Sequence, residues 1–239
     1  MAEMSAEHGR ILRIGGWCAV AGSLLAGVGN LVHPVTPMND PEGVARVIAD
    51  SGGWVPVHLA IVVGILLMLG GLVALYHSVG GGIAGTLARF GLWAAVSGVT
   101  IGPVLVILDG VAAHQLAKEW AAAPPGEQAV ALGLVHVNET INFALASLFN
   151  LVFAGVTFLL FGLAVALSGV HPRGLGWVVV VAGLASIGAG LVQAFTGEPT
   201  EASRALTIFG PTVITLWLLV VGFVLVRMGR EHAGSPARG

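Results

Sequence analysis

Six long apolar stretches constrain the fold of this chain more than any other feature of its sequence. A helix that crosses a membrane needs about 20 mostly apolar residues, and each stretch is long enough to do so. They cover residues 11–33, 55–78, 87–113, 136–168, 174–195 and 206–228. Only 9% of the residues are charged, against about 25% in a typical soluble domain, so the chain cannot cover a water-facing surface. We therefore predict an all-α polytopic membrane protein, a six-transmembrane-helix bundle.

The whole chain is interpreted as one membrane domain, 1–239, with short tails at residues 1–10 and 229–239. Within the first connection, VARVIA is predicted to form a short interfacial helix, and AKEWAAAPPGEQ is predicted to be a connection that contains a turn. No internal repeat indicates an inverted-repeat transporter. The single cysteine, Cys18, excludes an intrachain disulfide and a cysteine-based metal cluster.

The basic residues are divided unequally between the two sides of the predicted bundle. One side carries Arg10, Arg13, Arg89, Arg173, Arg227, Arg230 and Arg238. The other carries only Arg46, Lys118 and Arg204. Because Arg and Lys are enriched on the cytoplasmic side, we expect both termini in the cytoplasm. The chain has one Lys against nine Arg and is rich in Gly, Ala and Val, which indicates a GC-rich bacterial genome, so the protein is expected in the inner (plasma) membrane of a bacterium. The net charge of −2 offers no basic surface for nucleic acid.

The fourth stretch carries a stripe of polar side chains. On a helix that turns by about 100° per residue, one side collects His136, Glu139, Asn142, Ser147, Asn150 and Thr157. An ionised carboxylate that faces lipid costs at least about 2.5 kcal/mol, so Glu139 is expected to face other helices or a hydrated cavity. A plainer interpretation of Ser147, Asn150 and Thr157 is that they hydrogen-bond to neighbouring helices.

Other polar residues lie at the same predicted level, near the outer ends of their stretches. Asp109 falls on the helix face of Gly98 and Gly102, a small-xxx-small pair suited to close helix contact. The remaining residues of this group are His33, His58, His114 and Gln193, with Trp54 predicted as an interfacial anchor. Together with Glu139, they predict an outward-facing polar pocket.

This pocket suggests acid/base chemistry on a hydrophobic, lipid-like or isoprenoid-like small molecule that enters from the membrane lipid. Glu139 or Asp109 would be the acid and His136 the base or relay, since proton transfer near neutral pH needs such groups. Substrate-binding residues would be His33, His58, His114, Asn142 and Gln193. No cofactor is required by this hypothesis.

Three alternatives stay open. A transition metal or a haem would take its ligands from His58, His114, His136 and Glu139, since histidine and carboxylate are common metal ligands. A proton-coupled transporter would use the polar stripe as its pathway. An accessory subunit would use the stripe to bind another membrane protein.

The link into the fifth stretch, SGVHPRGLGWVVVVAGLASIGAGL, resembles that of a bacterial family of six-helix membrane proteins known only as a domain of unknown function. The pattern rests on Pro172, Arg173, Leu175, Gly176, Ala182 and Gly183. The resemblance extends over residues 10–228 in the number of spans and in the long link after the third. It implies a fold and no activity, so no functional residue is transferred.

Overall fold

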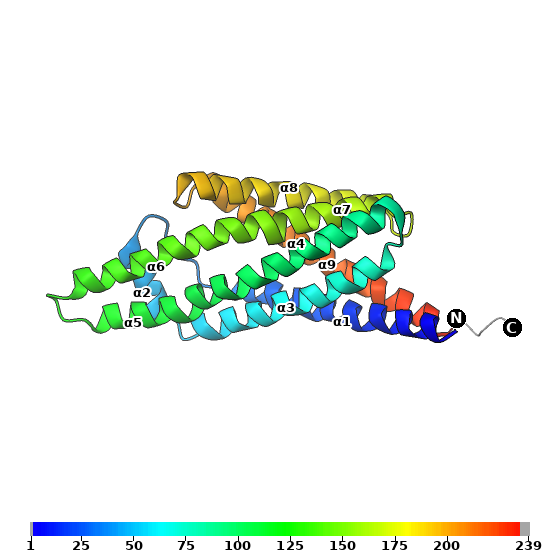
Figure 1. Cartoon of the computed structure of the whole chain (residues 1–239). Coiled ribbons are helices and arrows are strands. Elements are labelled where there is room, and N and C mark those ends of the chain that lie inside the picture. Colours follow the sequence, from blue (N-terminus) through cyan, green and yellow to red (C-terminus); the bar gives the residue numbers. More distant parts are fainter. Residues whose placement is uncertain (1, 235–239) are drawn as a thin grey trace.

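The chain folds into long helices that run side by side (Figure 1). The structure is a computed structural model that describes residues 2–234, with side chains from residue 6 to residue 231. The elements are α1 (Ala2–Val32), α2 (Pro41–Asp50), α3 (Trp54–Ser78), α4 (Gly82–Ile107), η1 (Leu108–Ala112), α5 (Ala113–Ala122), α6 (Gln128–Phe149), η2 (Asn150–Thr157), α7 (Phe158–Leu167), α8 (Arg173–Thr196) and α9 (Glu201–Gly234). No strand occurs among the described residues, which confirms the all-α prediction.

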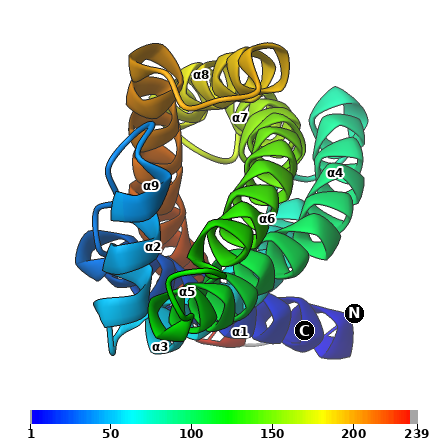
Figure 2. The ribbon, with the colours of Figure 1, turned by 90° about the vertical axis from the view of Figure 1, so that its left-hand side faces the viewer.

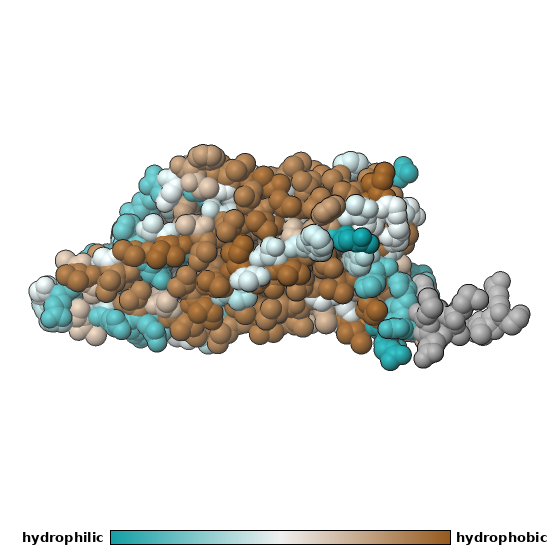
Figure 3. All heavy atoms as spheres, in the orientation of Figure 1, coloured by the Kyte–Doolittle hydropathy of each residue, from teal (hydrophilic) through white to brown (hydrophobic). Residues whose placement is uncertain are grey.

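Six helices are long and apolar enough to cross a membrane, as the sequence predicts. They are Ala6–Val32, Trp54–Ser78, Gly82–Ala122, Gln128–Leu167, Arg173–Thr196 and Glu201–Glu231. In Figure 3 hydrophobic residues cover the middle of the bundle, and hydrophilic residues gather at its two ends. The chain is therefore a multi-pass membrane protein.

The third and fourth spanning helices are longer than the sequence suggested. They run for 41 and 40 residues, and each contains a π-helical segment, η1 or η2, in its interior. The predicted connection AKEWAAAPPGEQ is mostly helical, because α5 continues to Ala122 and α6 begins at Gln128. As a result, α5 and the start of α6 form a hairpin that projects beyond the other helices (Figure 1).

Small residues allow the helices to pack closely. A methyl group on Gly16 would lie 2.8 Å from the Gly222 carbonyl oxygen, and one on Gly22 would lie 2.7 Å from that of Gly64. These contacts join α1 to α9 and to α3, at separations that larger side chains would prevent. On the other side of the bundle, α8 packs along α6, η2, α7 and α9.

The start of α1 and the end of α9 lie at one end of the bundle, and α2 lies at the other (Figure 1). We call the latter the α2 end. The short helix predicted within VARVIA is confirmed as α2, whose Ile48 and Ala49 pack against Ala113 and Ala117 of α5. Residues 1 and 235–239 of the predicted tails, Arg238 included, lie outside the described residues.

Candidate functional site

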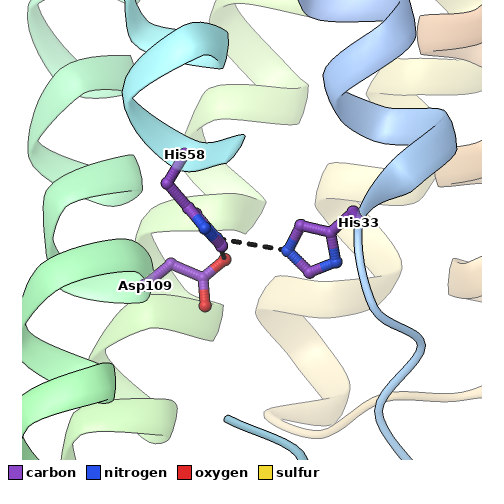
Figure 4. A group of neighbouring side chains, drawn as sticks. All are labelled: His33, His58 and Asp109. Carbon is purple, nitrogen blue, oxygen red and sulfur yellow. Dashed lines mark hydrogen bonds and ion pairs between the residues drawn. The ribbon is translucent and has the colours of Figure 1, made fainter. Parts of the chain in front are cut away.

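Two histidines and one aspartate from three separate helical segments meet at the α2 end (Figure 4). Nε2 of His58 lies 3.1 Å from Oδ2 of Asp109 and 3.2 Å from Nε2 of His33. One ligand atom from each of the three side chains lies within 4.8 Å of the others. We refer to these residues as the His–His–Asp cluster.

The local sequence places each histidine. His33 comes directly after the last residue of α1, where Pro34 disfavours a helical conformation of the residue before it. Its ring turns towards the bundle, and its Nδ1 lies 2.8 Å from the Pro34 carbonyl oxygen. His58 lies one turn into α3, where its Nδ1 is 2.6 Å from the Trp54 carbonyl oxygen and its side chain is almost fully buried.

The aspartate lies on the π-helical turn η1, a kind of distortion that is frequent at functional sites. Two side chains from neighbouring helices donate hydrogen bonds to carbonyl oxygens of this turn. Trp54 Nε1 donates to the Asp109 oxygen at 2.7 Å, and Asn138 Nδ2 donates to the Leu108 oxygen at 3.3 Å. These bonds anchor η1 to α3 and α6, and so hold the Asp109 carboxylate beside His58.

Gly110 makes the close approach of η1 and α3 possible. A methyl group at this position would lie 2.5 Å from Cβ of His58, so a larger residue would separate the two segments. Neither Gly110 nor the supporting Asn138 was identified from the sequence. The prediction that Trp54 is an interfacial anchor is wrong, because its side chain is 1% exposed. It instead donates a hydrogen bond to the Asp109 carbonyl oxygen in η1.

The backbone contacts of the two rings determine which nitrogens carry hydrogen. A carbonyl oxygen only accepts hydrogen bonds, so Nδ1 of both His33 and His58 is the donor, and Nε2 of each neutral ring keeps a lone pair. The ionised carboxylate of Asp109 is also only an acceptor. Three acceptors therefore converge on one point, and they need a cation between them, either a proton or a metal ion.

His33 is partly buried, and its surroundings shift the pKa of its imidazole ring. Burial lowers the pKa of His33 below the ordinary value of 6.5, and the neighbouring imidazole of His58 lowers it further. The charge of Asp109 and the hydrogen bond to the Pro34 carbonyl oppose this shift. The net result favours the neutral ring, whose Nε2 lone pair is free to bind a cation.

A pocket of about 600 Å³ lies beside the cluster. Its walls come from the end of α1, the following loop, α2, α6, the end of α8 and the start of α9, which surround one region of the α2 end (Figure 2). His33 belongs to both the cluster and the pocket wall. Glu139, His136 and Gln193 of the predicted site also line the pocket.

Glu139 has an unusual environment in this wall. Its Oε1 atom is buried and has no hydrogen-bond partner in the described part of the chain, and the same is true of Oδ1 of Asn142. The charge of Asp109 acts electrostatically on the Glu139 carboxyl. Asp109 is not a lining residue of the pocket, and it is linked to the pocket through His58 and His33.

Three polar side chains from three helices form a network at Gln193 on the pocket wall. Asn150 Nδ2 donates to Oε1 of Gln193 at 2.8 Å and to Oγ1 of Thr207 at 3.4 Å, and Gln193 Nε2 donates to Oγ1 of Thr207 at 3.3 Å. Asn150 thus bonds to neighbouring helices, as its plainer interpretation predicted. Ser147 and Thr157 instead donate to carbonyl oxygens of their own helix.

The remaining predicted residues lie outside the His–His–Asp cluster. His114 binds the Ile48 carbonyl oxygen through Nδ1 at 3.1 Å and so joins α5 to α2. His136 lies on the exposed part of the pocket wall. Of the alternative metal ligands suggested by the sequence, only His58 belongs to the cluster.

Asp109 does not share a packing partner with Gly98 and Gly102, although the sequence placed all three on one helix face. Gly98 lies against Phe153 and Gly102 lies against Phe149. The Asp109 carboxylate instead bonds to His58 of α3.

Comparison with curated proteins and with solved structures gives no match for this chain. The chain does match a known family over residues 14–222, a range that includes most of the first and last spanning helices and all of the four between them. The resemblance noted at the Pro172–Arg173 link is thereby confirmed. The chain belongs to the family described as domain of unknown function DUF4386.

Proposed function

We propose that this chain is a membrane-embedded metalloprotein, which binds a divalent transition metal ion through His33, His58 and Asp109. The convergence of two imidazole lone pairs and one carboxylate carries this proposal. Each imidazole also has its Nδ1 against a backbone carbonyl oxygen. That second contact is the usual support of a metal-binding histidine, since it fixes the tautomer and the direction of the ring.

The spacing of the cluster suits such an ion. Ligands at about 2.0–2.2 Å from a tetrahedral Zn²⁺ lie about 3.3–3.5 Å from each other, and the two closest pairs here are separated by 3.1 and 3.2 Å. Two histidines and one carboxylate form the ligand set of catalytic zinc sites and of non-haem Fe²⁺ sites. Both kinds of site keep coordination positions open for water or substrate.

An ion is favoured over a haem by the position of His58. Its Nε2, the nitrogen that is free to act as an axial ligand, is enclosed between His33 and Asp109. A haem iron requires the open space on one side of that nitrogen for the porphyrin ring. The cluster leaves room for a single ion.

The reaction assigned to this site is acid/base chemistry on a lipid-like molecule. A bound divalent ion would supply Lewis acidity for a coordinated water or carbonyl oxygen. Glu139, which lines the adjoining pocket and has an unpartnered oxygen, would take up and return the proton. His136, on the exposed wall, would relay it to solvent. In this scheme Asp109 is a metal ligand rather than the acid.

We assign the α2 end to the outer side of the inner membrane. The basic residues at the opposite end include Arg10, Arg13, Arg89 and Arg173, and such an excess marks the cytoplasmic side. Both termini would then be cytoplasmic, and the pocket would open outwards. Cysteine labelling on whole cells tests this direction. The variant carries Glu198→Cys in a Cys18→Ala background, and a membrane-impermeant reagent should label it from outside.

Metal analysis of the purified protein tests the main proposal. The chain is expected to carry about one Zn²⁺ or Fe²⁺ ion, and substitution with Co²⁺ should give the visible absorption of a His–His–carboxylate site. His33→Ala, His58→Ala and Asp109→Asn should lose the ion, whereas His136→Ala should keep it. A chain that binds no added Zn²⁺, Fe²⁺ or Co²⁺ would show that a proton holds the cluster together instead.

A further inference from the structure

The polar atoms of the pocket indicate which molecule it accepts. We propose that the pocket binds a single-chain amphiphile with an uncharged, hydroxyl-bearing head group, of the kind represented by a monoacylglycerol. This inference rests on the proposed function only for the direction of the head towards His33. The pocket volume of about 600 Å³ is within the usual range for small-molecule sites, roughly 300–1,000 Å³.

Thr207, which lines the pocket on α9, sets the first requirement on the head group of the ligand. Its Oγ1 accepts hydrogen bonds from Asn150 and from Gln193. A hydroxyl group has two lone pairs and one hydrogen, and both lone pairs are used here. No acceptor for the Thr207 hydrogen occurs among the described residues, so this hydroxyl is a donor available to a ligand in the pocket.

The second requirement on the ligand comes from the part of the pocket wall on α6. Oε1 of Glu139 is a buried acceptor without a partner in the described chain. A ligand that satisfies both residues must accept a hydrogen bond from Thr207 and donate one to Glu139. A hydroxyl group does both, and a polyol head offers two hydroxyls at separate positions.

In the metal-free chain, the charge of the wall disfavours an anionic head. The carboxylates of Asp40 and Glu198 line the pocket, and Arg204 is the single Arg or Lys residue in its described lining. A fatty acid or a phospholipid head would meet this excess of negative charge. A quaternary ammonium head would fit the charge, but it can neither accept from Thr207 nor donate to Glu139.

The apolar part of the ligand has a continuous path to the membrane. Val35 and Ile208 line the pocket, yet 75% and 60% of their surfaces are exposed. Phe143 on α6 lines the same cavity. An alkyl chain can therefore lie along these residues and leave the bundle sideways into lipid, while the head remains beside Glu139 and Thr207.

Native mass spectrometry of the metal-free, detergent-solubilised chain tests the inference with three ligands of equal chain length. These are a monoacylglycerol, the corresponding fatty acid and the corresponding alkyltrimethylammonium. The monoacylglycerol should bind at one saturable site and at least tenfold more tightly than the other two. Equal or tighter binding of the fatty acid or the ammonium compound, or absence of saturable binding of the monoacylglycerol, would overturn the assignment.

Matched variants locate the binding. Thr207→Val should weaken monoacylglycerol binding about fivefold to tenfold, the usual effect of one lost hydrogen bond. Thr100→Val is the control, because that hydroxyl is exposed on α4 and bonds to its own helix; it should leave binding unchanged. If both variants bind like the native chain, the head is not held at Thr207 and the proposal is wrong.

This titration, read together with the metal analysis, separates the inference from the proposed function. Selective binding of the monoacylglycerol to a chain that takes up no metal would support the pocket and refute the metal site. A chain that binds metal through His33, His58 and Asp109 but shows no head-group selectivity would retain the metal proposal and refute the ligand.

Discussion

Gly110 lies directly against His58, so that a methyl group at residue 110 would come within 2.5 Å of the His58 Cβ atom. Gly110→Ala should push η1 away from α3 and separate Asp109 from His58. Overpacking of this kind costs about 1–3 kcal/mol, so we expect a lower melting temperature together with weaker metal binding. Thermal unfolding in detergent and the Co²⁺ affinity of the same sample measure both effects.

Gly133→Ala is the control for this change. Gly133 is also helical, but a methyl group there meets nothing within 4 Å. Since alanine favours a helix by about 1 kcal/mol over glycine, this variant should be as stable as the native chain or slightly more so. If Gly110→Ala behaves like Gly133→Ala, η1 and α3 are not in tight contact.

Trp54→Phe should destabilise the chain by removing the hydrogen bond to the Asp109 carbonyl oxygen. A buried carbonyl left without its donor costs about 1–3 kcal/mol, and the smaller phenyl ring also leaves part of the buried indole volume unfilled, which lowers stability further. Trp93→Phe is the matched control, because Trp93 is 65% exposed. Equal melting temperatures of the two variants would show that the indole donor is not needed by the π-helical turn.

Much of the fold could be predicted because hydropathy alone identifies membrane helices. A run such as 55–78 has too few polar groups for any other environment, and its observed helix, Trp54–Ser78, differs by one residue at its start. The level of the polar residues along each helix was also predictable from the rise of about 1.5 Å per residue. That argument brought Asp109, Glu139, His33 and His58 to one end of the bundle.

The partners of these residues could not be predicted, because η1 interrupts the regular helix. Angles counted at about 100° per residue place Asp109 with Gly98 and Gly102, but a π-helical turn changes the direction of the residues around it. Nothing in the residues of LDGVA marks such a turn. The donors that support it, Trp54 and Asn138, come from other helices, so their role depends on tertiary packing.

His171 should make the stability of the chain depend on pH. Its Nε2 donates to Ser78 Oγ at 2.9 Å, because the Ser78 hydroxyl itself donates to the Leu75 carbonyl oxygen. Burial lowers the pKa of His171 below the ordinary 6.5. As pH falls below 6.5, the unfolded chain binds a proton that the folded chain excludes, so stability decreases until the folded pKa is reached.

Melting temperatures between pH 7.5 and pH 5 measure this effect. Over that interval the native chain should lose stability relative to His171→Gln, which keeps a donor for Ser78. A native chain that gains stability on acidification relative to His171→Gln would show that the folded state prefers the charged ring.

Glu139 and its neighbour Asn138 should respond oppositely to the same substitution, leucine. Asn138 is buried and donates to the Leu108 carbonyl oxygen, so Asn138→Leu should lower the melting temperature. Glu139 keeps a buried oxygen without a partner in the described chain, at a cost of about 1–3 kcal/mol, so Glu139→Leu should raise it. Residues held for function often reduce stability in this way. A Glu139→Leu chain that melts below the native one would mean that this carboxyl supports the fold rather than the chemistry of the pocket.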